Sequence, residues 1–73
     1  MTIRDLVYDV ECQGNVCVKK IVERENDYDI VVVCEFDCQL YESKELTPYL
    51  DYEVSYIYAN SANQLCIEFR VSE

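Results

Sequence analysis

A run of alternating apolar residues between Tyr28 and Leu40 constrains the fold of this chain more than any other sequence feature. The stripe comprises Tyr28, Ile30, Val32, Cys34, Phe36, Cys38 and Leu40. Successive side chains of a β-strand point to opposite faces of a sheet, so the stripe predicts one long strand with this side turned to the core. The intervening residues are acidic near both ends and aliphatic at Val31 and Val33, which predicts a partly wet second face.

A second strand is predicted just before this run. Residues 16–22 are rich in β-branched side chains, but Lys19 and Lys20 break the strict alternation, which predicts a bulge or an edge position. The charged residues 23–27 predict a turn, so the two strands should form a hairpin.

The C-terminal residues predict a second hairpin. Residues 53–59 and 64–71 have strand composition, and they flank a polar connection at residues 60–63. Within the last strand, the alternating apolar residues are expected to point inward; these are Leu65, Ile67, Phe69 and Val71.

Two helical segments are predicted. The spacing i, i+3, i+4, i+7 of one helix stripe is formed by Ile3, Leu6, Val7 and Val10. We expect a helix from about Ile3 to Cys12, in which Thr2 caps the first turn and Asp5 answers it as in a capping box. A single short helical turn is predicted at Thr47-Pro48, because proline favours the first helical position.

Together these elements predict a single α+β domain spanning residues 1–73. Its N-terminal helix packs on a roughly four-stranded, mainly antiparallel sheet, with the short helical turn before the last hairpin. A chain of 73 residues has room for one hydrophobic core. The predicted core comprises Ile3, Leu6, Val7, Val10, Ile30, Val32, Cys34, Phe36, Leu65, Ile67 and Phe69.

The charge is unusual: fifteen Asp and Glu against six Lys and Arg, without His, give a formal net charge of −9. Direct binding to nucleic acid or to anionic lipid is disfavoured, because phosphate contacts require a cationic surface. A basic protein partner is favoured, although acidity can also serve solubility alone. Residues 1–20 predict no signal peptide and no stretch predicts a membrane span, so we expect a cytoplasmic protein, in the host cell if a phage encodes it.

Five cysteines raise the alternative of zinc binding; they are Cys12, Cys17, Cys34, Cys38 and Cys66. Their odd number without a secretory signal favours reduced thiols over a disulfide framework. Cys34 and Cys38 would lie roughly 13 Å apart along one strand, too far to share an ion. We therefore expect no metal and no other cofactor, and we expect Cys66 to be an accessible thiol, facing away from Leu65 and Ile67.

No pattern of catalytic residues is present. There is no His to serve as a base, and the single glycine excludes a glycine-rich phosphate cradle. Carboxylate pairs have no diagnostic value in a chain this acidic. We therefore expect a protein that is not an enzyme.

Seven tyrosines, several of them beside carboxylates, favour binding to another protein, because tyrosine is common at interface hot spots. Carboxylates two apart on a strand project from the same side, so they could imitate a row of phosphates. The predicted partner-binding residues are Asp27, Tyr28, Asp29, Glu35, Asp37 and Tyr41. The predicted partner is a protein with a basic nucleic-acid-binding surface.

In size, acidity, tyrosine content and lack of catalytic motifs, the chain resembles the small phage and mobile-element proteins that block host defence, including many anti-CRISPR proteins. Residues 1–6 (MTIRDL), 54–58 (VSYIY) and 65–68 (LCIE) also look like segments of short proteins from Gram-positive bacterial mobile elements. The resemblance implies tight stoichiometric inhibition of a nucleic-acid-binding nuclease, through occupation of its DNA or guide-RNA surface.

The main alternative is a structural or interaction module that self-associates. Val31 and Val33 lie on the predicted wet side of the long strand, and exposed apolar patches often mark interfaces. Burial of this patch against a second copy would give a homodimer.

Overall fold

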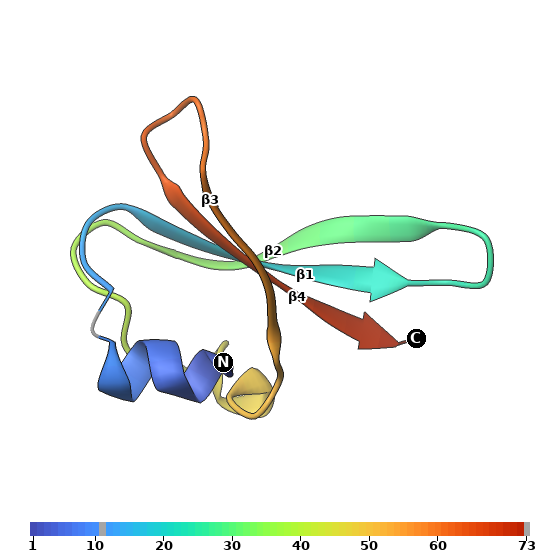
Figure 1. The fold of residues 1–73 in the computed structure, drawn as a ribbon, viewed down its shortest axis with the longest axis horizontal. Coiled ribbons are helices and arrows are strands. Elements are labelled where there is room, and N and C mark those ends of the chain that lie inside the picture. Colours follow the sequence, from blue (N-terminus) through green and yellow to red (C-terminus); the bar gives the residue numbers. More distant parts are fainter. Residues whose placement is uncertain (11, 73) are drawn as a thin grey trace.

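In the computed structural model, which describes residues 1–10 and 12–72, four strands form one mixed sheet in the order β2-β1-β4-β3 (Figure 1). The strands are β1 (Val16–Glu23), β2 (Tyr28–Phe36), β3 (Val54–Ala59) and β4 (Leu65–Ser72). The two hairpins β1–β2 and β3–β4 are antiparallel, whereas the central strands β1 and β4 run parallel. The predicted four strands are confirmed, and helix makes up only 14% of a mostly β chain.

The first helical segment is much shorter than predicted. It is a π-helical segment, η1 (Asp5–Asp9), rather than a helix from Ile3 to Cys12. Its hydrogen bonds span five residues, as in the 2.9 Å bond from the Val10 N–H to the Asp5 carbonyl. This wider turn moves Val10 off the face shared by Ile3 and Leu6, so Val10 is 51% exposed and its assignment to the core is wrong.

The predicted cap of this segment is confirmed. The Thr2 N–H donates to the Asp5 carboxylate at 2.9 Å, and the Asp5 N–H donates to Thr2 Oγ1 at 3.3 Å. The backbone hydrogen bond from Thr2 lowers the pKa of Asp5 below its usual value. Asp5 therefore contributes stability at neutral pH that is lost as acid protonates it.

A bulge in β2 changes which residues face the core. Val18 pairs with Cys34 and Lys19 pairs with Val32, so Val33 is an extra residue on β2. The extra residue reverses the alternation along the rest of the strand. The sequence predicted that β1 carries a bulge or lies at an edge; its pairing with β2 is indeed irregular, but the extra residue belongs to β2, and β1 lies inside the sheet.

The reversal places the first half of the predicted stripe on the opposite face. Ile30 and Val32 are each 50% exposed, so their assignment to the core is wrong, as is the inward orientation of Tyr28. Cys34 and Phe36, beyond the bulge, do pack against the core. Leu40 is fully buried, whereas Cys38 is exposed.

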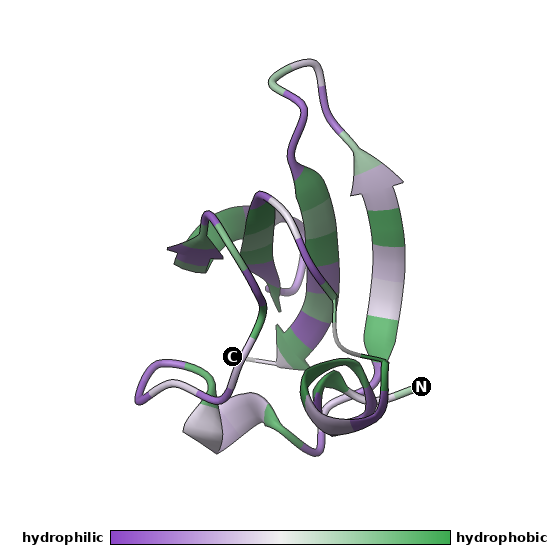
Figure 2. Ribbon diagram, turned by 90° about the vertical axis from the view of Figure 1, so that its left-hand side faces the viewer, coloured by the Kyte–Doolittle hydropathy of each residue, from purple (hydrophilic) through white to green (hydrophobic). Residues whose placement is uncertain are grey.

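The core lies on the face that β1 and β4 share with both helical segments. Figure 1 shows these segments on the same side of the sheet, and Figure 2 shows apolar residues dominating the central strands. Its buried members are Ile3, Leu6, Val7, Val16, Val18, Leu40, Leu46, Leu50, Ile67 and Phe69. The inward orientation predicted for Ile67 and Phe69 is confirmed, and Leu65 and Val71 are partly buried against the same cluster.

The long connection from β2 to β3 closes the core from one end. Leu46 and Leu50 are buried on either side of η2 (Thr47–Tyr49), a 3-10 turn with Pro48 near its start, as predicted. The Tyr49 ring lies 5.0 Å from the ring of Phe69, centroid to centroid. This connection therefore anchors the aromatic end of the core through Phe69.

Both predicted turns are confirmed. The Arg24 N–H donates to the Asp27 carbonyl at 2.8 Å, which closes the β1–β2 hairpin. The Asn60 N–H donates to the Gln64 carbonyl at 3.0 Å, and Asn63 has a positive φ of 60° in the β3–β4 turn. Asparagine tolerates this left-handed conformation better than most residues.

The same substitution at two isoleucines tests this register. Ile67→Ala should cost about 2–5 kcal/mol, because it opens a cavity in the core, whereas Ile30→Ala should cost about 0.5 kcal/mol or less. Urea unfolding at low protein concentration, where association does not contribute, measures both. Equal losses at the two positions would show that β2 has no bulge and that Ile30 is buried.

Candidate protein-binding surface

The sheet face opposite the core carries half-exposed apolar and aromatic side chains, and we call it the open face. The regular β1–β4 register shows which residues of the central strands point to this side. Residues of the edge strands β2 and β3 are assigned to the same side from their pairing partners on β1 and β4. The residues of the open face are Cys17, Lys19, Ile21 and Glu23 of β1, Tyr28, Ile30, Val32 and Glu35 of β2, Tyr56 and Tyr58 of β3, and Cys66, Glu68 and Arg70 of β4.

The middle of the open face is buried although it does not belong to the core cluster. Cys17, Ile21 and Cys66 are each at most 8% exposed. They lie on the central strands β1 and β4, between the two edge strands. The open face is therefore a shallow second layer rather than a flat polar surface.

Glu68 is the buried charge of this layer. It is 6% exposed, and the Tyr58 hydroxyl donates a hydrogen bond to its Oε2. Lys19 is its cross-strand neighbour on β1. The hydrogen bond to the carboxylate, together with burial, raises the pKa of Tyr58, because ionising the phenol would place two negative charges side by side.

An open groove of about 540 Å³ lies on this face near the β1–β2 hairpin. It is lined by Ile21, Glu23, Asn26, Asp27, Tyr28, Ile30, Tyr56, Glu68 and Arg70. Arg70 Nη2 donates to the Tyr56 hydroxyl at 2.8 Å, and the guanidinium lies 5.4 Å from the centroid of the same ring. Tyr56 therefore holds Arg70 in a defined position at the groove.

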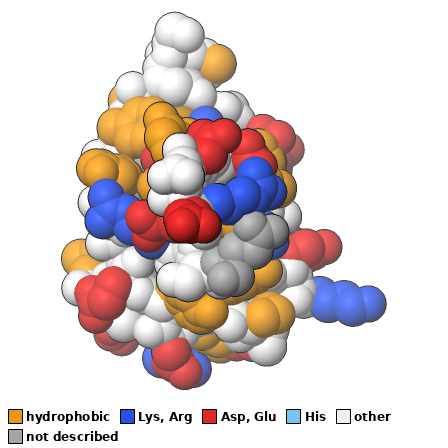
Figure 3. Space-filling model, turned by 90° about the vertical axis from the view of Figure 1, so that its right-hand side faces the viewer, with side chains coloured by type: hydrophobic (Ala, Val, Ile, Leu, Met, Phe, Trp, Pro, Cys, Tyr) orange, Lys and Arg blue, Asp and Glu red, His pale blue; other side chains and the backbone are white. Residues whose placement is uncertain are grey.

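The tip of the β1–β2 hairpin concentrates exposed carboxylates. Glu23, Glu25, Asp27 and Asp29 are all exposed within seven residues, and Arg24 forms an ion pair with Asp29. The hairpin projects from one end of the molecule in Figure 1. Figure 3, which views this end, shows acidic and basic side chains beside an apolar patch. We call residues 23–29 the acidic hairpin.

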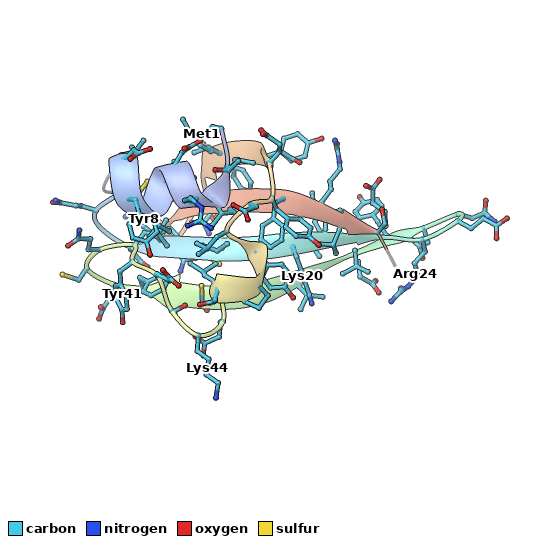
Figure 4. All side chains as sticks on the ribbon, turned by 90° about the horizontal axis from the view of Figure 1, so that it is seen from below. Met1, Tyr8, Lys20, Arg24, Tyr41 and Lys44 are labelled. Carbon is cyan, nitrogen blue, oxygen red and sulfur yellow. The ribbon has the colours of Figure 1, made fainter. Side chains whose placement is uncertain are left out.

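The structure does not bring the six predicted partner-binding residues together. Asp27, Tyr28 and Asp29 lie in the acidic hairpin, whereas Glu35 lies roughly 23 Å from Tyr28 along β2. Figure 4 shows Tyr41 and Arg24 at opposite ends of the molecule.

The bulge also separates the predicted carboxylate pairs. Asp29 pairs with Val22 on the core side of the sheet, and Glu35 pairs with Cys17 on the open face. The expectation that Asp29 and Glu35 share one side is therefore wrong. Asp27 and Asp37 lie outside β2, and both are exposed.

The other two predicted carboxylate and tyrosine positions have local partners. Glu35 accepts a hydrogen bond from Gln64 Nε2 at 2.8 Å. The exposed ring of Tyr41 packs edge-on against Phe36, with 4.8 Å between centroids. Both contacts hold these side chains at the end of the molecule that lies away from the acidic hairpin.

The prediction from sequence missed Ile21, Tyr56, Glu68 and Arg70, which line the groove. Tyr56 and Tyr58 alternate with Ile57, so their common face was detectable. The parallel pairing that brings Glu68 and Arg70 beside Lys19 and Ile21 had no local signal, because the paired residues are far apart in sequence.

All five cysteines are free thiols, but Cys66 is fully buried, so its predicted accessibility is wrong. Burial raises the pKa of Cys12 and Cys17, and it raises the pKa of Cys34 to about 11. Within the described ranges 1–10 and 12–72, no group of three Cys, Asp or Glu side chains is arranged to hold a metal ion. Cys38 lies beyond the end of β2, so the separation of Cys34 and Cys38 expected along one continuous strand does not apply to them.

No helix in the described part of the chain combines the length and the apolar character needed to cross a bilayer. Neither the protein-family models, nor the curated proteins, nor the solved structures compared with this chain match it. The surface chemistry is therefore the basis for any functional assignment.

The rate of alkylation should distinguish the exposed thiol of Cys38 from the thiols buried beneath the open face. Iodoacetamide at mildly alkaline pH should alkylate exposed Cys38 first and leave Cys17 and Cys66 protected by burial. Cys34 should also react slowly, because its raised pKa keeps the thiol protonated. Mass spectrometry of timed samples measures the order, and unfolded protein should lose the protection. Alkylation of native Cys66 as fast as Cys38 would contradict the buried second layer.

Proposed function

We propose that this chain is a non-catalytic inhibitor that binds the cationic nucleic-acid site of another protein, in the manner of an acidic nucleic-acid mimic. The acidic hairpin carries the proposal. Its exposed carboxylates project from one end of the sheet beside the half-exposed ring of Tyr28. Arg and Lys side chains that neutralise phosphates can pair with carboxylates through similar charge-assisted hydrogen bonds.

The acidic hairpin combines two kinds of contact that tight binding needs. A single surface ion pair contributes only about 0–1 kcal/mol, so several carboxylates must engage together. Glu23, Glu25 and Asp27 lie within a stretch of five residues at the β1–β2 turn, so all three can contact the same partner surface. Tyr28 adds an aromatic anchor, the type of residue that contributes most at interfaces.

The net charge supports a cationic partner over a nucleic acid or a membrane. At −9, the chain repels phosphate-bearing surfaces and attracts basic proteins over a distance of about one Debye length, roughly 8–10 Å at physiological salt. The ion pairs found among the described residues involve Glu53, Asp51 and Asp29. Glu25 and Asp27 have no ion pair among those residues, so they are available to an incoming cation.

Two double variants with the same change in charge test the proposal. Glu25→Lys with Asp27→Lys reverses the tip of the acidic hairpin, and Asp37→Lys with Glu45→Lys reverses exposed carboxylates elsewhere. Affinity capture from a nuclease-containing bacterial lysate first identifies the partner of the unmodified chain. The hairpin variant should bind this partner at least about tenfold more weakly, a change of about 1.4 kcal/mol, and the control should bind nearly as well as the unmodified chain.

Competition then tests the mimicry itself. DNA or RNA should displace the chain from the partner, and the affinity should fall as salt rises. Simultaneous binding of the chain and nucleic acid, without mutual weakening, would contradict the proposal. Equal weakening by the two double variants would show that total charge, rather than the acidic hairpin, governs the interaction.

A further inference from the structure

We propose that the open face is a dimer interface, on which a second copy of this chain packs face to face. This proposal concerns the face of the sheet, whereas the inhibitor function rests on the carboxylates of the acidic hairpin; the two surfaces share Glu23 and Tyr28. It rests on three properties of the open face: its apolar exposure, its low charge and its aromatic anchors.

The open face carries exposed apolar and aromatic side chains on both of its edge strands. Ile30 and Val32 of β2 are half exposed, and Tyr28, Tyr56 and Tyr58 are 40–60% exposed. A sheet covered on one side usually presents polar residues to water on the other. Exposed apolar side chains on such a face often mark an interaction site.

The open face also carries little net charge, although the chain as a whole is acidic. Two cations, Lys19 and Arg70, stand against three carboxylates, Glu23, Glu35 and Glu68, which gives a formal charge of −1 out of the total of −9. Glu68 is already buried and accepts a hydrogen bond from Tyr58. A face with so little net charge repels a second copy only weakly and attracts a strongly basic partner only weakly, and this favours a second copy as its occupant.

The same face carries side chains typical of interface centres. Tyrosine and arginine are enriched at interfaces, and Tyr56 holds Arg70 through both a hydrogen bond and a ring contact. A two-fold dimer requires each copy to present both a hollow and a protruding group. The groove supplies the hollow, and Val32 and Tyr58, which lie on the open face outside the groove lining, supply protruding groups.

The available area is consistent with a stable dimer. A standard interface buries about 800 Å² on each partner. This is about one sixth of the 4741 Å² surface of the chain. One whole face of a four-stranded sheet can supply that share.

Two adjacent valines provide a matched test. Val32 lies on the open face and is 50% exposed, whereas Val31, also in the middle of the edge strand β2, lies on the core side and is 42% exposed. Light scattering after size exclusion, at about 100 µM protein, should give the unmodified chain twice its 8.6 kDa mass, because interfaces of this size bind at micromolar concentrations or below. Val32→Glu should give the monomer mass, and Val31→Glu should remain a dimer.

Each other outcome overturns the proposal. A monomer mass for the unmodified chain would show that the open face does not self-associate. Equal loss of the dimer in both variants would indicate edge-to-edge pairing through β2, since both residues lie on that strand. Dimers in both variants would place the contact elsewhere. Circular dichroism should check that the Val32→Glu variant retains its β-sheet. If that variant does not fold, Ile30→Lys, on the same strand and face, takes its place in the test.

Two measurements separate this inference from the proposed inhibitor function. The dimer should persist at high salt, because its contacts are mainly apolar, whereas binding to a cationic partner should weaken. The single variant Glu25→Lys, which lies in the acidic hairpin but outside the groove lining, should remain a dimer even if it binds the partner more weakly. Loss of the dimer on raising salt would overturn the face-to-face interface and leave the inhibitor proposal untouched.

Discussion

Strand β1 is the element on which the rest of the structure depends, because it pairs with β2 on one side and with β4 on the other. Its residues alternate between two environments: Val16 and Val18 enter the core, and Cys17 and Ile21 lie beneath the open face. The parallel register with β4 extends this alternation across the sheet, with Ile67 and Phe69 on the core side. Because β2 and β4 both pair with β1, its register determines which of their residues lie on each face of the sheet.

Local signals were sufficient to predict most of the elements and their turns. The cap formed by Thr2 and Asp5, the turn at Pro48 and the hairpin connections all depend on residues close in sequence. The bulge was predicted only in general terms, from the lysines of β1, and the extra residue lies on β2 at Val33. Residues 30–34 (IVVVC) are all apolar, so nothing in their composition shows where the alternation reverses.

The candidate surface could be predicted only in part, for the same reason. A reversal of one residue transfers every side chain beyond it to the other face of the sheet. It moved Tyr28, Ile30 and Val32 out of the expected core and onto the open face, and it placed Asp29 and Glu35 on opposite sides. The groove also needs Glu68 and Arg70, which reach it through a pairing between strands more than forty residues apart.

The hydrogen bond between Tyr58, which is partly exposed, and buried Glu68 gives the open face a polar centre. A buried carboxylate without a partner would cost several kcal/mol, so the Tyr58 hydroxyl must face Glu68 whenever the sheet is formed. This requirement fixes the register of β3 against β4 and positions Tyr56, two residues earlier, over the groove with Arg70. The polar contact thus organises the apolar surface around it, because the aromatic rings available for binding are held by the same strand that satisfies the buried charge.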